Sequence, residues 1–194
     1  VLVLVACVVW FGPNEASARG QWGSHHLSMG TDSLTWLIDG YSVIATFEHH
    51  GLPSLRAHAE LFGIDVPASI LDAHAPNQGE GWRRRIDGAF MFSVDHHPFP
   101  ALKGLHWGAG FNLQHSTVSR VGSSAVATYA TFEPIVRLGY QWFPLGTSGL
   151  FLAPYVALGF PLHLNEPDPI DGQRYEEAAV LPVASVQVGW RFPI

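Results

Sequence analysis

The sequence predicts an all-β chain folded as an eight-stranded antiparallel up-and-down barrel. Three observations lead to this prediction. Apolar and polar residues alternate with a period of two along most of the chain, which is the side-chain repeat of a β-strand. Short and long connections follow one another between the alternating segments, as they do in an up-and-down barrel. After the first eleven residues, no segment has the roughly 18 consecutive apolar residues of a membrane-spanning helix.

The first segment of the chain has the features of a processing signal. Val1 to Phe11 is an unbroken apolar run, too short to cross a bilayer as a helix. Ala16-Ser17-Ala18 then supplies the small-residue pattern that a signal peptidase recognises. We therefore predict that residues 1–18 are a secretory signal truncated at its start. Leu4-Val5-Ala6-Cys7 offers a second interpretation, a lipoprotein signal, although the apolar run continues beyond the cysteine.

Seven strands are predicted from the alternation. They are 41–49, 55–64, 85–95, 104–115, 126–142, 149–162 and 182–192. In the segment 126–142 one face is apolar, and the other face carries Glu133 and Arg137. Tight turns are expected near 50–54, 96–103 and 144–148, and long polar connections at 65–81, 116–124 and 163–178.

An eighth strand is needed, because bacterial single-chain barrels have even strand numbers. The candidate is Ser33–Ile38, which is followed by Asp39-Gly40, a favoured hairpin turn. A short helix capped by Asp32 or Ser33 is the alternative. The predicted organisation is thus a linker over 19–32 and a barrel over 33–194.

The composition indicates whether the polar face of the strands points into the barrel or outward. Charged residues make up only 13% of the chain, against about 25% in soluble domains. The polar face carries small residues and nearly balanced charges, with arginine rather than lysine as the cation, as a confined ion-pair network requires. The predicted network inside the barrel comprises Glu48, Arg56, His58, Glu60, Arg85, Asp87, Asp95, Glu133, Arg137, Gln141 and Arg191. The fold class is therefore a transmembrane β-barrel whose polar lumen is plugged by side chains.

Aromatic residues on the apolar face favour the same interpretation. If the strands alternate in direction, one group falls near the short-turn end, as an interfacial girdle would. This group is Phe47, Phe92, Trp107, Tyr140, Trp142, Trp190 and Phe192. Tyr41, Phe111 and Phe160 are expected near the opposite level.

The signal segment, the alternating strands, the aromatic girdle and the final strand VASVQVGWRF together resemble small Gram-negative outer-membrane barrels of the OmpA/OmpX type. The resemblance covers roughly residues 33–192. It implies a bacterial outer-membrane location, contact with membrane lipid and lipopolysaccharide, and insertion by the barrel-assembly machinery. Members commonly end on phenylalanine, whereas here Phe192 is followed by Pro193 and Ile194. The expected protein is a monomer with a structural or surface-interaction role.

The sequence leaves two alternative functions open. Lipid A deacylases are outer-membrane barrels that use a serine, a histidine and a glutamate, for which this chain offers Ser116, His115 and Glu133 as weak catalytic candidates. Their motif resembles His-x-Ser-Asn, from which Gln114-His115-Ser116-Thr117 departs. A soluble lipocalin-like binder, with the apolar face turned inward around a small ligand, is the other alternative. An enzyme is the less favoured interpretation.

The remaining charged and metal-binding residue types give few functional signals. Adjacent histidines such as His49-His50 and His96-His97 point to opposite faces of a strand, so one pair cannot readily bind one ion. These four lie at short-turn ends, where a site shared across turns is the alternative, but neither a metal site nor a cofactor is predicted. The chain has one lysine and no basic cluster suited to nucleic acid. Arg83 and Arg84 form the basic run on the long-loop side and are the predicted contacts to lipopolysaccharide phosphates.

Overall fold

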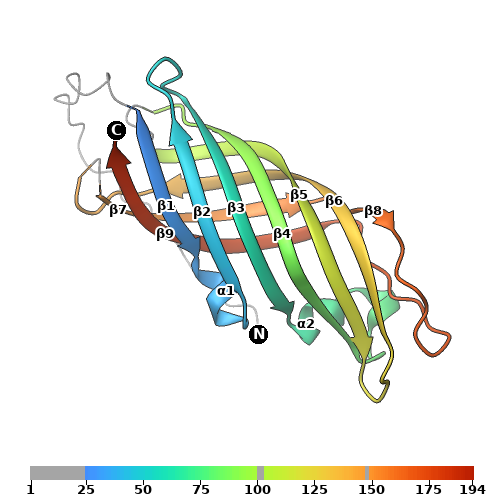
Figure 1. The fold of residues 1–194 in the computed structure, drawn as a ribbon. Helices are drawn as coiled ribbons and strands as arrows, with labels where there is room; N and C mark the ends of the chain where they lie inside the picture. The colour runs from blue at the N-terminus through green and yellow to red at the C-terminus, as the bar shows by residue number, and fades with distance from the viewer. Residues whose placement is uncertain (1–24, 100–102, 147–148) are drawn as a thin grey trace.

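A computed structural model of the chain describes residues 25–99, 103–146 and 149–194. It is a closed antiparallel barrel of eight strands, in which β9 pairs back onto β1 (Figure 1). The wall consists of β1 (His26–Asp32), β2 (Tyr41–Glu48), β3 (Leu55–Val66), β4 (Trp82–His96), β5 (Gly104–Arg120), β6 (Val126–Gln141), β7 (Gly149–Gly159) and β9 (Leu181–Pro193). The predicted fold class is confirmed.

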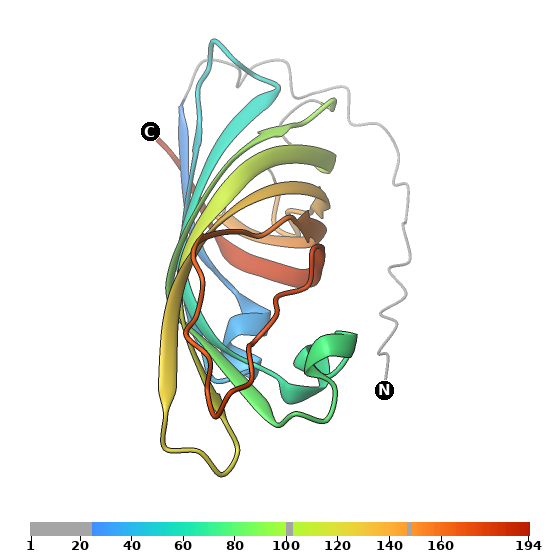
Figure 2. The same ribbon diagram turned by 90° about the vertical axis from the view of Figure 1, so that its right-hand side faces the viewer.

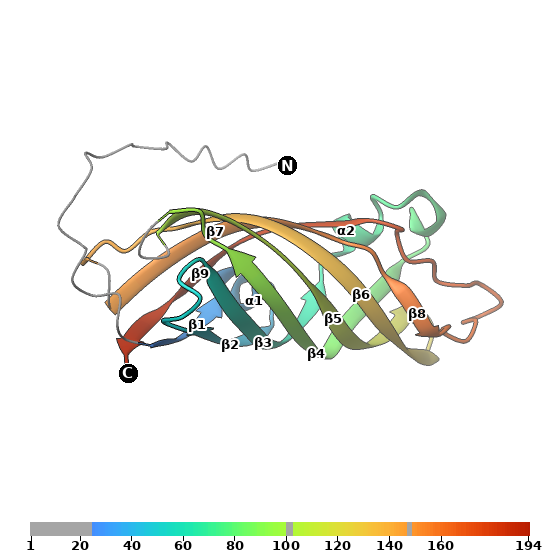
Figure 3. The same cartoon turned by 90° about the horizontal axis from the view of Figure 1, so that it is seen from above.

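The connections differ at the two ends of the barrel. Short connections join β2 to β3, β4 to β5 and β6 to β7, at the end where β1 begins and β9 finishes. The opposite end carries α1 (Ser33–Leu37), α2 (Ala68–Leu71), a 3-10 turn at Ala75–Asn77, and β8 (Leu162–Asn165). Figures 2 and 3 show α2 at this long-loop end, away from the C-terminus. Neither α1 nor α2 has the length and apolarity of a membrane-spanning helix, and no other described helix does. The predicted signal segment, residues 1–18, lies outside the described residues.

The first strand lies earlier in the chain than the sequence predicted. The segment Ser33–Ile38 is not a strand, because Ser33–Leu37 forms the helix α1. The Asp32 carboxylate accepts a hydrogen bond from the Leu34 amide at 2.9 Å and so caps the helix, as in the alternative weighed above. The first strand is instead β1, within the segment assigned to the linker, and it pairs with both β2 and β9.

The predicted strand 149–162 is divided in two. β7 pairs with β6 and β9 as far as Gly159, and β8 then continues along β6 only. The chain after β8 folds back over the long-loop end, where Ile170 and Tyr175 are buried against Trp82, Val118 and Tyr129. This apolar plug anchors the longest connection of the barrel.

A β-bulge in β4 changes which side chains point into the barrel. On the β3 side Phe62 pairs with Ala89 and Ile64 with Ile86, so β4 holds one more residue than its partner between these pairs. The same extra residue appears against β5, between Ile86 and Gly88. Even-numbered residues therefore point inward before the bulge and odd-numbered residues after it, which strict alternation could not predict.

The outer face of the barrel is apolar and the inner face is polar. Trp107, Val136 and Leu158 point outward with 47%, 48% and 43% of their surface exposed. Glu133 and Arg137 point inward and are 3% and 4% exposed. This arrangement contradicts the lipocalin-like alternative, which required the apolar face of the strands to line the interior.

Candidate functional site: the barrel lumen

An ion-pair network centred on Asp95 lies in the short-turn half of the lumen. This carboxylate is completely buried near the end of β4. Arg137, from β6, donates to its two oxygens at 2.8 and 2.6 Å, and Arg56, from β3, donates to Oδ2 at 2.8 and 3.2 Å. One anion on β4 thus holds two guanidinium groups, one from β3 and one from β6.

Polar groups around this centre complete the network. Arg56 also donates to the Gln141 side chain, and Arg191 pairs with Glu48 on the neighbouring part of the wall. His97 and His106 stack at this end, with ring centroids 4.7 Å apart. The wall makes room for the network at Gly108, where a Cβ would overlap an Asp95 carboxylate oxygen. An eight-stranded barrel has an interior just wide enough for side chains such as these.

A second polar cluster lies toward the long-loop end. Arg84 donates to Gln114 at 3.0 Å and forms an ion pair with Glu177, which comes from the long connection after β8. Gln114 in turn donates to Glu133 at 2.5 Å. The pair between Arg84 and Glu177 ties the apolar plug to the barrel wall.

Between the plug and the short-turn network the lumen contains a cavity of about 350 Å³. Its wall is mainly apolar and includes Phe62, Ile64, Met91, Ile135 and Ala157. Polar groups gather at one part of the wall, where Tyr155 and Ser185 both donate to Asp32, with the Tyr155 contact at 2.8 Å. The volume lies within the range of about 300–1,000 Å³ that is typical of small-molecule pockets.

Most predicted lumen residues lie inside the barrel. Those that do are Glu48, Arg56, His58, Glu60, Asp95, Glu133, Arg137, Gln141 and Arg191. The exceptions are Arg85 and Asp87, which point outward, while Arg84 points inward. The bulge in β4 is the physical reason, because it reverses the alternation in the residues that precede it. Arg84 was predicted to contact lipopolysaccharide and is instead 5% exposed.

The weak catalytic candidates do not form a triad. Neighbours on β5 point to opposite faces, so His115 is exposed outside the barrel and Ser116 is buried inside it. The His115 ring faces Asp87, with Nδ1 3.4 Å from a carboxylate oxygen, and Glu133 bonds to Gln114 in the lumen. The imidazole therefore cannot act as the base for the Ser116 hydroxyl in this arrangement.

The predicted aromatic girdle is only partly at one level. Trp107, Trp142 and Trp190 point outward and are about half exposed, each within a few residues of the short-turn end. Phe92, however, pairs directly with Phe111 across β4 and β5, with ring centroids 6.1 Å apart. These two phenylalanines share one level, although they were assigned to opposite ends.

Sequence reasoning missed several residues of the lumen. The sequence suggests Asp32 only as a helix cap and gives no signal for Ser185, yet Asp32, Tyr155 and Ser185 form one partly buried cluster. Glu177 lies in a segment interpreted as a polar loop. Tyr155 carried a usable signal, since it lies on the same face of its strand as Ala153, Ala157 and Gly159, which are small inward residues.

Comparisons with known proteins yield structural similarity alone. No protein-family model and no curated protein matches the sequence. The N-terminal β-barrel domain of Pseudomonas aeruginosa OprF is similar at 10% identity, over 87% of this chain and 97% of that chain, with a TM-score of 0.47. Neisserial surface protein A (NspA) is similar at 13% identity, over 88% and 95%, with a TM-score of 0.42. By its own strand pairing, the described chain is a closed eight-stranded antiparallel barrel.

Proposed function

We propose that this chain is an integral outer-membrane protein with a closed lumen and a structural or surface-interaction role in the cell envelope. The observation that carries the proposal is the distribution of side chains between the two faces. Large apolar side chains point outward from every one of the eight strands of the wall, and the buried ion pairs lie inside. Such a surface would be costly in water and is stable against lipid tails.

Fractionation of cells that express the chain tests the membrane location. The protein is expected in the outer-membrane fraction, resistant to extraction by alkaline carbonate, and to migrate differently on gels before and after boiling. Recovery from the periplasm without detergent, with no heat-dependent migration, would refute the proposal.

Closure of the lumen is tested separately by conductance. Because Asp95, Arg56 and Arg137 join three strands across the interior, the purified barrel is expected to show no stepwise conductance in planar bilayers. Regular single-channel steps from the wild-type protein would contradict closure without affecting the membrane location. The two parts of the proposal can thus fail independently.

Arg83 is the remaining candidate for contact with lipopolysaccharide. Arg83 is exposed at the long-loop end of β4, whereas Arg84 is buried and forms an ion pair with Glu177. A guanidinium at this level can donate two hydrogen bonds to a phosphate. Arg83→Gln is expected to reduce lipopolysaccharide co-purification, and Lys103→Gln, an exposed cation at the opposite end, is the matched control. Equal retention by wild type and Arg83→Gln would remove this contact.

A second candidate function, binding of a small apolar molecule, rests on the cavity. Its size and apolar wall suit a ligand with one polar group, which the cluster around Asp32 could bind. N-phenyl-1-naphthylamine is a suitable fluorescent probe. Ala157→Phe places a ring in the cavity and should abolish probe binding, whereas Ala109→Phe adds the same ring to the outer face and should not. Identical probe fluorescence in both variants would refute binding in the cavity.

A further inference from the structure

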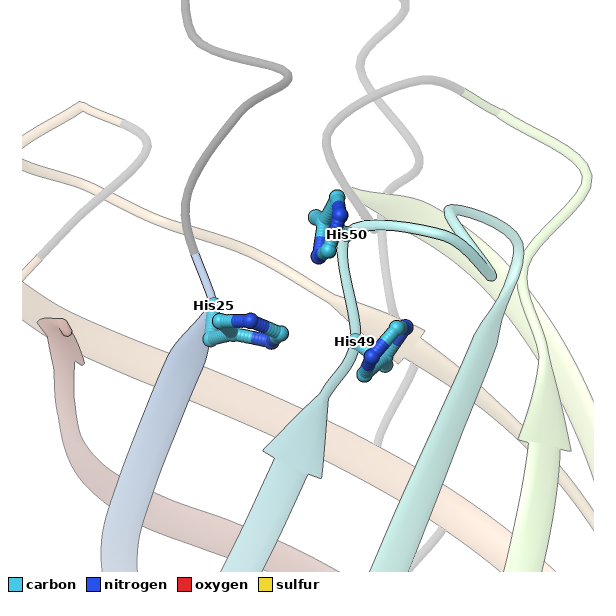
Figure 4. A group of neighbouring side chains, drawn as sticks. All are labelled: His25, His49 and His50. Atoms are coloured by element: carbon cyan, nitrogen blue, oxygen red, sulfur yellow. The ribbon is translucent and has the colours of Figure 1, made fainter.

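Three histidines from two separate segments meet at the short-turn rim of the barrel, outside the lumen (Figure 4). His25 precedes β1, and His49 and His50 directly follow β2. The antiparallel register pairs His26 with Glu48, so the residues just beyond that pair are brought side by side. The Ile194 amide donates to the His25 carbonyl at 2.9 Å and holds the backbone of the first histidine in place.

The three rings are arranged around a common point. Each pair of ring centroids is 4.7 Å apart, and one nitrogen of each ring lies within 4.8 Å of the other two. Three nitrogens that bind a tetrahedral ion at about 2.05 Å lie roughly 3.3 Å from one another. Rotation of the exposed His49 and His50 side chains can close this difference without a change in the strands.

The surroundings orient the rings and leave nitrogens available. His25 stacks on the Phe47 ring at 5.8 Å, and no group within the described chain hydrogen-bonds to its buried Nδ1. His49 Nδ1 accepts a hydrogen bond from the Gly51 amide at 3.0 Å. Binding of an ion at Nε2 would move the ring proton to Nδ1, so the Gly51 amide would lose this acceptor.

We propose that His25, His49 and His50 form a binding site for a divalent transition-metal ion of the zinc class, with water in the fourth position. Imidazole nitrogen favours zinc, copper, nickel and cobalt over magnesium and calcium, which prefer oxygen ligands. Three histidines and one open position are a common ligand set for zinc. The site depends only on the pairing of β1 with β2, so it is independent of the proposed ligand cavity and of lipopolysaccharide contact.

The test is titration of the refolded, untagged full chain in detergent with Co²⁺ and with Zn²⁺. We expect one ion per chain, a visible Co²⁺ absorption band of four-coordinate intensity, and its displacement by Zn²⁺. His50→Gln and His25→Gln should each weaken binding about tenfold or more, whereas His115→Gln, another exposed histidine, should leave it unchanged. Heat-dependent gel migration confirms that each variant is folded.

A second readout distinguishes this site from scattered surface histidines. Zn²⁺ should shift the amide resonance of Gly51, because its hydrogen bond to His49 is lost. Absence of stoichiometric binding, equal weakening by His115→Gln, or full binding by His50→Gln would each overturn the proposal.

Discussion

Replacement of Asp95 by asparagine is the sharpest test of the lumen network. The asparagine keeps the shape of the side chain but removes the charge that two arginines share. Both Arg56 and Arg137 are almost completely buried, so their guanidinium groups would remain in the interior without a counter-ion at Asp95. We expect the folded barrel to lose much of its stability.

The size of the effect follows from the geometry. The Arg56 contact to Asp95 is 2.8 Å long and the Arg137 contact is 2.6 Å long. With an effective dielectric constant of about 20, Coulomb's law gives roughly 6 kcal/mol of attraction at such a separation. Desolvation of the ions offsets several kcal/mol of this. Removal of one partner from a buried pair then costs about 3–5 kcal/mol.

Equilibrium unfolding in urea, with the barrel in lipid vesicles and tryptophan fluorescence as the signal, measures this cost. Asp65→Asn is the matched control, because Asp65 pairs with Arg85 at 3.2 Å while both side chains are about half exposed. An exposed pair contributes about 1 kcal/mol or less. Arg137→Gln, added to Asp95→Asn, should recover part of the lost stability. If Asp95→Asn and Asp65→Asn differ by less than about 1 kcal/mol, the reasoning is wrong.

Three further predictions follow from the same structure. Gly110→Ala should destabilise the barrel by about 1–3 kcal/mol, because its Cβ would meet the backbone oxygen of the adjacent strand, whereas at Gly88 the atom nearest to an added Cβ is the Tyr41 hydroxyl oxygen, at an ordinary contact distance of 3.8 Å; similar unfolding midpoints for the two would contradict this. Arg84→Gln should loosen the long-loop plug and increase proteolysis of residues 166–180, and Arg83→Gln should not; equal cleavage would count against the buried pair. Burial beside the Arg56 guanidinium lowers the pKa of His97 to about 2, so only the unfolded chain binds this proton below about pH 6.5. Stability measured by urea unfolding should therefore fall from pH 7 to pH 4, and less steeply in His97→Gln; equal slopes in the two proteins would contradict this assignment.

The strands and the polarity of their faces could be predicted because alternation is a local signal. Six of the seven segments between residues 41 and 192 lie within three residues of the observed bounds of β2, β3, β4, β6, β7 and β9. The segment 104–115 was predicted too short, because β5 continues to Arg120 through residues expected in a polar connection. The first strand was not predicted because the sequence of β1, HLSMGTD, shows little alternation between apolar and polar residues. Its pairing with β9 joins segments that are far apart in the sequence, which a local pattern does not reveal. The segment Ser33–Leu37 fits both the strand and the helix periodicity, and the cap from Asp32 stabilises the helix.

The lumen was predictable only as far as strict alternation holds. Asp95, Arg56 and Arg137 follow the period of two, and all three are buried inside the barrel. Arg84 points inward and Arg85 points outward, the reverse of the prediction. The reason is that no residue type in the sequence indicates the bulge that separates them from Asp95. The contribution of Glu177 depends on a long connection folding back into the barrel, which periodicity cannot detect.

The bulge in β4 has a consequence for how the strand tolerates changes in length. Between Ile86 and Ala89, both neighbouring strands offer one residue fewer than β4 does. Asp87 is thus supernumerary in both ladders, and its deletion would leave Arg84 and Asp95 facing inward. Deletion of a residue elsewhere in β4 would shift the alternation by one residue. All side chains on one side of the deletion would then point to the opposite face of the sheet. We expect this site to accept shortening more readily than any regular part of the wall.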